Sequence, residues 1–126
     1  MKLMIVDDDS YIADVISAYL KRHSCDVIIY SGMSDGLRHM MEEKVDAVIL
    51  DLHMPGMGAI EAVPIVREIN PDAVVGIISG DASAGAKNAA LNAGADFFLQ
   101  KWNEIPNIMK EINKVSSKQL AVNSKQ

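Results

Sequence analysis

The sequence predicts an α/β fold: a doubly wound, five-stranded parallel sheet covered by five helices. Five short runs of apolar and β-branched residues alternate with five stretches in which apolar residues recur at helical spacing. This alternation places successive strands in parallel, with helices on both faces of the sheet. A chain of 126 residues is also the usual size for one domain with a full core.

The five predicted strands are each bounded by polar residues or by Gly and Asp. The runs are apolar at nearly every position rather than at alternate positions, which is typical of strands buried on both faces. The predicted strands are Lys2–Val6, Val27–Tyr30, Ala47–Leu50, Ala73–Ile78 and Asp96–Gln100.

The first, second and last predicted helices each carry one apolar face. Either Asp9 or Ser10 would make a good N-cap for the first helix. The polar residues from Ser116 onward predict a frayed terminus or the start of a linker, which gives one domain over residues 1–116 and a tail over 117–126. The apolar faces consist of Ile12, Val15, Ile16, Tyr19 and Leu20; of Leu37, Met40 and Met41; and of Ile105, Ile108, Met109, Ile112 and Val115.

The third and fourth predicted helices are less regular. The third begins near Gly58–Ile60 and contains Pro64, so it either starts late, near Val63, or begins irregularly and kinks. The fourth, about Ala82–Asn92, has Leu91 as its only large apolar residue. We therefore expect burial to hold the fourth helix only weakly to the sheet.

The composition excludes several classes of protein. A net charge of −5 argues against a nucleic-acid surface, which needs clustered Lys and Arg. No apolar run approaches the roughly 18 residues that insert across a membrane, and three aspartates by position 9 do not resemble a signal peptide. Cys25 is the one cysteine, so there is neither a disulfide framework nor a thiol-rich metal site. A reducing, cytoplasmic setting fits these features.

Polar side chains follow four of the five predicted strands. Asp7-Asp8-Asp9 follows the first, Asp51 the third, Ser79-Gly80-Asp81 the fourth, and Lys101 the fifth. Ligands of open α/β sheets bind beyond the carboxyl ends of the strands, so we expect these groups at one rim. Each residue alone fits a cap, a turn or a solvated charge better, but their joint occurrence at one rim favours a site.

The predicted rim suits a divalent cation and a phosphoryl group. Carboxylates of the acidic triplet that converge with Asp51 would repel it unless a proton or a cation relieved the repulsion. Only oxygen ligands are present, which favours Mg²⁺ or Mn²⁺. A cation held there would draw a phosphoryl group toward Asp51. Lys101 and Ser79 would bind other phosphoryl oxygens.

With these residues assembled, the sequence resembles the receiver domain of two-component response regulators over roughly residues 2–115, with its flavodoxin-like architecture. Single-domain, chemotaxis-regulator-like receivers are the nearest in kind. Together the motifs are specific, although each alone is weak. They are Ile5-Val6-Asp7-Asp8-Asp9, Leu50-Asp51-Leu52-His53-Met54-Pro55-Gly56-Met57, Ile78-Ser79-Gly80, Ala93-Gly94-Ala95-Asp96 and Lys101.

The resemblance implies a role for each matching position. Asp51 is the aspartate that takes a phosphoryl group from a sensor histidine kinase or a phosphotransfer protein. Asp7 and Asp8 hold Mg²⁺, directly or through water, and the backbone carbonyl of His53 is the third protein ligand. Two further residues, Ser79 and Phe98, form the switch: the hydroxyl binds the phosphoryl group and the aromatic ring turns inward. Together with Asp81, the His53 side chain would tune how easily water reaches the acyl phosphate.

The resemblance also implies the partners of the domain. Its output surface is the fourth helix, fifth strand and fifth helix, which control a protein target or an attached output domain, and a phosphorylation-dependent dimer is compatible with that surface. It implies no direct nucleic-acid contact, no membrane insertion, and no enzyme activity beyond the domain's own phosphotransfer and dephosphorylation. The sequence leaves open whether the chain is stand-alone or cut from a longer protein.

Two positions depart from the family pattern. The usual Met-Pro-x-Met-Asp-Gly ends here as Met57-Gly58-Ala59, and the usual proline after the lysine is Trp102. A cis bond before a non-proline residue costs about 3–4 kcal/mol, so we expect a trans Lys101–Trp102 bond, or a strained cis one. We expect Trp102 either to lie partly exposed, as a reporter or a partner hot spot, or to pack on the last helix.

Three alternative functions share part of this pattern. A haloacid-dehalogenase-type phosphatase also uses a strand-end aspartate and Mg²⁺, but it needs a second acid where this chain has His53. A flavodoxin-like cofactor binder would want a Gly/Ser/Thr phosphate loop after the first strand, where three carboxylates stand. A degenerate receiver that only binds proteins ranks second, because the residues for phosphoryl transfer are all present.

Overall fold

The computed structural model describes residues 1–81 and 83–124, with only the backbone described for residues 118–124. Strands and helices alternate along the chain, apart from one 3₁₀ turn (η1) before the last helix. The elements are β1 (Lys2–Val6), α1 (Ser10–Lys21), β2 (Asp26–Tyr30), α2 (Met33–Glu42), β3 (Ala47–Asp51), α3 (Ala59–Ile69), β4 (Val74–Ser79), α4 (Ala84–Asn92), β5 (Phe97–Gln100), η1 (Ile105–Asn107) and α5 (Ile108–Ser124).

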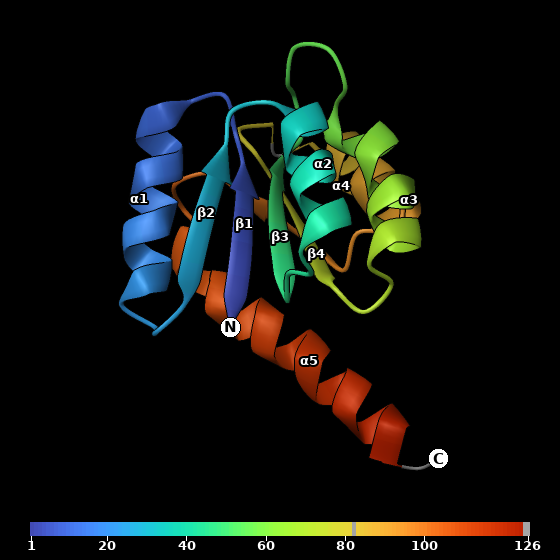
Figure 1. Ribbon diagram of the computed structural model, residues 1–126. Coiled ribbons are helices and arrows are strands. Elements are labelled where there is room, and N and C mark those ends of the chain that lie inside the picture. Colours follow the sequence, from blue (N-terminus) through green and yellow to red (C-terminus); the bar gives the residue numbers. More distant parts are fainter. Residues whose placement is uncertain (82, 125–126) are drawn as a thin grey trace.

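The five strands form one parallel sheet in the order β2-β1-β3-β4-β5, with β1 and β3 adjacent near its middle (Figure 1). This confirms the predicted doubly wound α/β fold. The chain order reverses after β2, where β1 is flanked by both β2 and β3. In such sheets the carboxyl ends of the strands at the reversal form a natural binding position.

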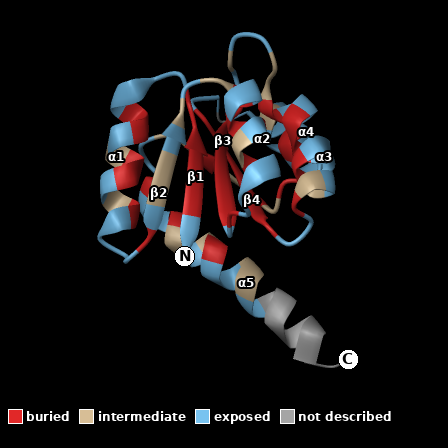
Figure 2. Cartoon of the chain, viewed as in Figure 1, coloured by how far each residue is buried: buried red, intermediate tan, exposed pale blue. Residues whose placement is uncertain are grey.

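Each face of the sheet is covered by its own hydrophobic cluster. One cluster joins α2, α3 and α4 to the sheet, and the other joins α1 and α5 to the opposite face. Figure 2 shows the buried residues concentrated in the central strands and on the inner sides of the helices. The two layers bury the side chains of β1, β3 and β4 completely, apart from Lys2.

The sheet edges differ from the prediction that all five strands are buried on both faces. β2 has no fully buried residue, and β5 alternates between buried and half-buried positions. Both are edge strands with one neighbour each, so part of every side chain there meets solvent. Apolar composition alone does not separate an edge strand from a central one.

The third helix, α3, begins at Ala59, earlier than the late start that was one of the two predictions. A start near Val63 is wrong, because α3 runs from Ala59 and already has the Ala62 N–H to Gly58 carbonyl bond at 3.1 Å. Pro64 lies inside the helix on its exposed side. There water can satisfy the backbone carbonyl that loses its helical partner to the proline ring.

The fourth helix is held weakly, in line with the prediction. Ala90 is its one buried residue, and Leu91, its only large apolar side chain, is 39% exposed. The predicted first residue, Ala82, lies outside the described residues. By contrast, α5 continues in helical form to Ser124, so the described part of the predicted frayed tail is helical. The domain boundary near residue 116 stays a prediction.

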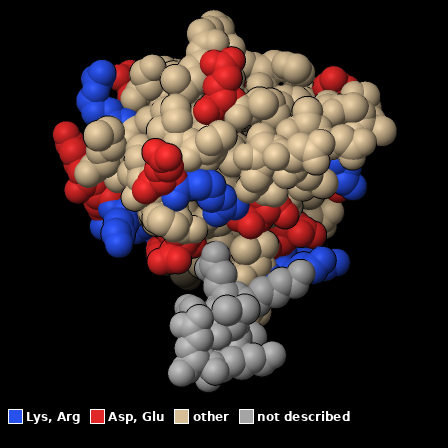
Figure 3. All heavy atoms as spheres, turned by 90° about the vertical axis from the view of Figure 1, so that its right-hand side faces the viewer, with Lys and Arg blue, Asp and Glu red and all other residues tan. Residues whose placement is uncertain are grey.

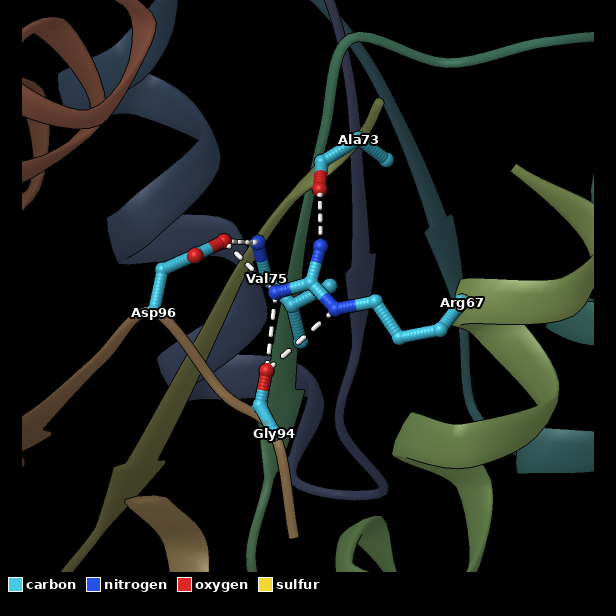
Figure 4. A network of polar contacts seen from close by, with 5 residues as sticks. All are labelled: Arg67, Ala73, Val75, Gly94 and Asp96. Carbon is cyan, nitrogen blue, oxygen red and sulfur yellow. Dashed lines mark hydrogen bonds and ion pairs between the residues drawn. The ribbon is translucent and has the colours of Figure 1, made fainter. Parts of the chain in front are cut away.

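A network around Arg67 fixes the link that follows α4 to the rest of the domain (Figure 4). The guanidinium of Arg67, which projects from α3, donates to the carbonyls of Ala73 and Gly94 and to Asp96 Oδ2, at 2.8–3.3 Å. The same carboxylate oxygen accepts from the Val75 N–H at 2.8 Å. The link between α4 and β5 is therefore tied to α3 and to the start of β4.

Candidate phosphoryl-transfer site

The predicted site residues meet at the carboxyl ends of the central strands. Asp7 follows β1 directly, and Asp51 is the last residue of β3. Ser79 ends β4, and Lys101 follows β5. The register of the parallel strands therefore brings these four residues to the same rim of the sheet.

The acidic triplet after β1 divides into two functions. Asp9 is the N-cap of α1, and its Oδ1 accepts from the N–H groups of Tyr11 and Ile12 at 3.0 and 3.3 Å. The Asp9 N–H in turn donates to Asp7 Oδ1 at 2.9 Å. The cap thus explains Asp9 but leaves Asp8 and one oxygen of Asp7 for another purpose.

Carboxylate oxygens of Asp7, Asp8 and Asp51 lie within 4.8 Å of one another. Asp7 and Asp51 are buried, whereas Asp8 is exposed. The buried Asp7 Oδ2 pairs with the Lys101 ammonium at 3.4 Å. One ammonium does not balance three carboxylates, and a divalent cation would relieve the remaining repulsion.

Burial and, after it, the charge of Asp7 raise the pKa of Asp51 from 3.8 to about 6. Lys101 opposes both effects, because its ammonium favours the ionised form. The carboxylate is thus charged at neutral pH but poorly solvated. This combination favours both a nearby cation and reaction of the carboxylate as a nucleophile.

Lys101 reaches into the carboxylate cluster. Its Nζ lies 3.2 Å from Asp51 Oδ1 and 3.4 Å from Asp7 Oδ2, and only 12% of its side chain is exposed. Burial alone would lower the pKa of Lys101, but the charges of Asp51 and Asp7 raise it above its ordinary value. The ammonium is therefore a fixed positive charge directly beside Asp51.

Ser79 is bound into the same rim. It is buried, its Oγ accepts from the Asp81 N–H at 2.9 Å, and its backbone carbonyl accepts from the Lys101 N–H at 2.8 Å. On the neighbouring strand β5, Phe98 is half-buried against the cluster that includes α4. The hydroxyl and the ammonium are thus carried by the ends of two neighbouring strands, and the aromatic ring lies earlier on β5.

His53 and Asp81 face each other at the outer rim. His53 Nε2 lies 3.9 Å from Asp81 Oδ2, and the two side chains are 72% and 45% exposed. The Ser83 N–H, more than His53, holds the pKa of Asp81 below its usual value. Both side chains are therefore accessible to water at the outer edge of the site.

The Lys101–Trp102 bond is trans, since the described residues contain no cis peptide bond, and this confirms the first of the two predictions. Trp102 has a φ of +73° and is 52% exposed, as expected for a partly exposed ring. Its ring packs against Tyr11 of α1, at 5.9 Å between centroids. The alternative, packing of Trp102 on the last helix, stays a prediction.

Sequence reasoning missed two residues near the site. Tyr11 lies on the exposed side of α1, outside its apolar stripe, and the stripe therefore gave no signal for it. Glu104 lies in a loop, and its Oε1 accepts from the Gln100 N–H at 3.0 Å. A carboxylate three residues after Lys101 is visible in the sequence, but its backbone partner is not.

None of the helices in the described part of the chain is long and apolar enough to cross a membrane. The response regulator receiver domain family matches residues 3–113. Among curated proteins, the transcriptional regulatory protein PrrA of Mycobacterium tuberculosis is 30% identical over 100 residues, which cover 79% of this chain and 43% of PrrA. The haem response regulator HssR of Staphylococcus saprophyticus is 30% identical over 112 residues, 89% of this chain and 50% of HssR. This chain therefore spans half or less of the length of these relatives.

Solved structures share the fold closely. A receiver domain protein from Clostridium thermocellum superposes with a TM-score of 0.85 at 25% identity, over 96% of this chain and 98% of its own. A response regulator from Burkholderia pseudomallei, solved with a phosphorylated aspartic acid, a calcium ion and citrate, superposes with a TM-score of 0.82 at 21% identity, over 99% of this chain and 74% of its own.

Proposed function

The chain belongs to the response regulator receiver domain family, and from this premise we propose that Asp51 accepts a phosphoryl group from a histidine kinase or a phosphotransfer protein in a Mg²⁺-dependent reaction. One observation carries the proposal. The buried Asp51 carboxylate lies beside Lys101 Nζ, at 3.2 Å, and within 4.8 Å of the oxygens of Asp7 and Asp8.

The transfer needs little covalent chemistry from the domain. A carboxylate oxygen of Asp51 attacks phosphorus, the N–P bond of the donor phosphohistidine breaks, and its electron pair stays on the imidazole nitrogen. Water later attacks the aspartyl phosphate and releases inorganic phosphate. Ionised Asp51 is the reactive form, and its raised pKa of about 6 leaves it ionised at neutral pH.

The residues at the rim fit a divalent cation. Asp7, Asp8 and Asp51 offer carboxylate oxygens, and we propose the His53 backbone carbonyl as the further protein ligand. A hard oxygen donor set suits Mg²⁺ or Mn²⁺ better than a transition metal that prefers nitrogen or sulfur. A bound cation would neutralise part of the negative charge that accumulates when a phosphoryl group joins the three carboxylates. The excess of three carboxylates over the one Lys101 ammonium supports this assignment.

Lys101 and Ser79 would bind oxygens of the phosphoryl group and so respond to phosphorylation of Asp51. Lys101 Nζ now pairs with Asp51 and Asp7, and it would move its pairing to a phosphoryl oxygen once Asp51 is modified. The Ser79 hydroxyl can rotate to donate to another phosphoryl oxygen, with Phe98 turning inward behind it. His53 and Asp81, both exposed at the rim, would set how readily water reaches the acyl phosphate.

The signal would leave through α4, β5 and α5. The weak burial of α4 supports this, because a switch needs an element that little holds in place. Lys87 is the one charged residue of α4. Figure 3 shows the side of the molecule where α3 and α4 lie, and there more charged side chains lie in the middle and lower part than in the upper part. We propose a cytoplasmic protein target or output domain, or a phosphorylation-dependent dimer, as the partner of this surface. The domain signals, and we propose no activity on other substrates.

Intact-mass analysis after treatment with acetyl phosphate and Mg²⁺ tests the proposal. The native chain should gain one phosphoryl group, and chelation of the metal or Asp51→Asn should abolish the gain. Asp14→Asn is the matched control, because it removes an exposed carboxylate of α1 to which we assign no part in the site. An unchanged mass, or the same gain in Asp51→Asn, would overturn the assignment.

Lys101→Ala tests the second step. This variant should still accept a phosphoryl group, more slowly, but should fail to change the amide exchange of α4 on phosphorylation. A normal response of α4 in Lys101→Ala would exclude Lys101 as the group that transmits the signal.

A further inference from the structure

The turn after β5 holds its second residue in a conformation that the residue type disfavours. Trp102 has a φ of +73°, in the left-handed region where bulky side chains are rare. Such a conformation persists only where neighbouring contacts fix the backbone. Trp102 directly follows Lys101, so whatever fixes this turn also fixes the base of the lysine side chain.

Glu104 closes the turn from both sides. Its carboxylate Oε1 accepts from the Gln100 N–H at 3.0 Å, and its own N–H donates to the Gln100 carbonyl at 3.2 Å. The Gln100 N–H at the end of the edge strand β5 thus has a side-chain acceptor. This pair of hydrogen bonds satisfies the backbone donor and the backbone acceptor of Gln100 together.

Two further contacts join the closed turn to its surroundings. The Lys101 N–H donates to the Ser79 carbonyl at 2.8 Å, which attaches the turn to β4. The Glu104 carbonyl accepts from the Asn107 N–H at 2.8 Å, which attaches it to η1. The half-buried Glu104 therefore lies between the strand that precedes Lys101 and the 3₁₀ turn that leads to α5.

We propose that Glu104 is a positioning residue for Lys101: by accepting from the Gln100 N–H it holds the Gln100–Glu104 turn closed and keeps Lys101 Nζ against Asp51 and Asp7. This rests on the proposed function for the role of Lys101 in phosphoryl transfer. The hydrogen-bond acceptor, rather than the negative charge, is what the turn requires. The Tyr11 contact of the Trp102 ring is secondary to it.

Amine labelling of the native, full chain tests the turn without any phosphodonor. Lys101 is 12% exposed, so its acetylation by an N-hydroxysuccinimide ester, measured on peptides against exposed Lys87, reports opening of the turn. Glu104→Ala should speed labelling of Lys101 about fivefold, the change expected for the loss of one hydrogen bond. Glu104→Gln keeps a carbonyl acceptor and should label like the native chain. Glu68→Ala, an exposed carboxylate of α3, is the matched control and should change nothing.

A second variant separates the clamp from the aromatic ring. Glycine adopts a positive φ without strain, so Trp102→Gly should keep the turn closed and leave Lys101 labelling unchanged. Phosphorylation by acetyl phosphate should then slow about fivefold in Glu104→Ala and stay normal in Glu104→Gln and Trp102→Gly.

Several results would overturn the proposal. Unchanged Lys101 labelling in Glu104→Ala would do so, as would equal effects of Glu104→Ala and Glu104→Gln on that labelling. So would faster Lys101 labelling in Trp102→Gly. The proposal would also fail if Glu104→Ala lost enough stability in urea unfolding to explain its faster Lys101 labelling. If the native chain took no phosphoryl group at all, the proposed function would fail, while the labelling results would still decide whether Glu104 holds the turn.

Discussion

Asp51→Asn should stabilise the folded chain at neutral pH when no divalent cation is present. The carboxylate is buried and lies near Asp7, so its ionised form is less favourable in the folded chain than in the unfolded one. An amide of the same shape removes that charge. A residue central to function would thus reduce stability, as expected for a site built to hold like charges together.

The size of the effect follows from the shift in pKa. The pKa of Asp51 rises from 3.8 to about 6, and each unit corresponds to about 1.36 kcal/mol, so ionisation costs at most about 3 kcal/mol of folding free energy. The folded chain keeps the proton to higher pH than the unfolded chain. The penalty is therefore absent below the unfolded pKa, grows between 3.8 and about 6, and is complete above that. Because Lys101 loses one partner in the variant and water reaches the rim, we expect a gain of about 1–2 kcal/mol at pH 7.5.

Urea unfolding in the presence of a chelator measures this difference. The free energy of unfolding of Asp51→Asn should exceed that of the native chain at pH 7.5, and the gap should close toward pH 4. Saturating Mg²⁺ should narrow the gap at pH 7.5, since the cation stabilises the native chain more. A variant that is less stable at pH 7.5, or a gap that does not change with pH, would refute the reasoning about charge repulsion.

Four further changes test the packing and the cation site. Gly76→Ala should cost about 3 kcal/mol in urea unfolding, because its Cβ would lie 2.2 Å from the Phe97 ring; adding Phe97→Leu should recover part of the loss. Gly58→Asp should raise the free energy of unfolding by a few tenths of a kcal/mol in the same assay, because an aspartate can cap α3. Gly58 has a φ of −89°, and an added Cβ would meet no atom closer than 3.5 Å. A loss of stability would contradict this. Arg67→Gln should lower the urea midpoint by an amount that corresponds to about 2 kcal/mol, as the network of Figure 4 loses its donors. At 100 times its dissociation constant, Mg²⁺ should add about 2.7 kcal/mol to the native chain, and much less to Asp7→Asn if the cluster is the site.

Much of this architecture could be predicted from the sequence because strand and helix periods alternate so regularly. The five strands were located within a residue or two, and the sheet rule then brought Asp7, Asp51, Ser79 and Lys101 to one rim. The burial of β2 was overestimated, because an edge strand and a central strand can have the same apolar composition. The start of α3 could not be decided, because whether Pro64 is tolerated depends on which side of the helix faces water.

The least predictable part was the turn after β5. The trans bond at Trp102 followed from the cost of a cis bond before a non-proline residue, but the left-handed φ did not. Glu104 forms its contact with a backbone N–H, and a sequence shows side chains more clearly than the backbone groups they satisfy. The contact between Tyr11 and Trp102 joins residues far apart in the chain and follows no local pattern.

The position of the phosphoryl group is the most direct test of the central claim. Borohydride reduction converts an aspartyl phosphate to homoserine, which peptide sequencing by mass spectrometry can locate after treatment with acetyl phosphate and Mg²⁺. The account predicts homoserine at Asp51, in the peptide that joins β3 to α3, and at none of the three aspartates that follow β1. Homoserine at Asp7 or Asp8, or no reduced residue in a chain that has gained phosphoryl mass, would contradict it.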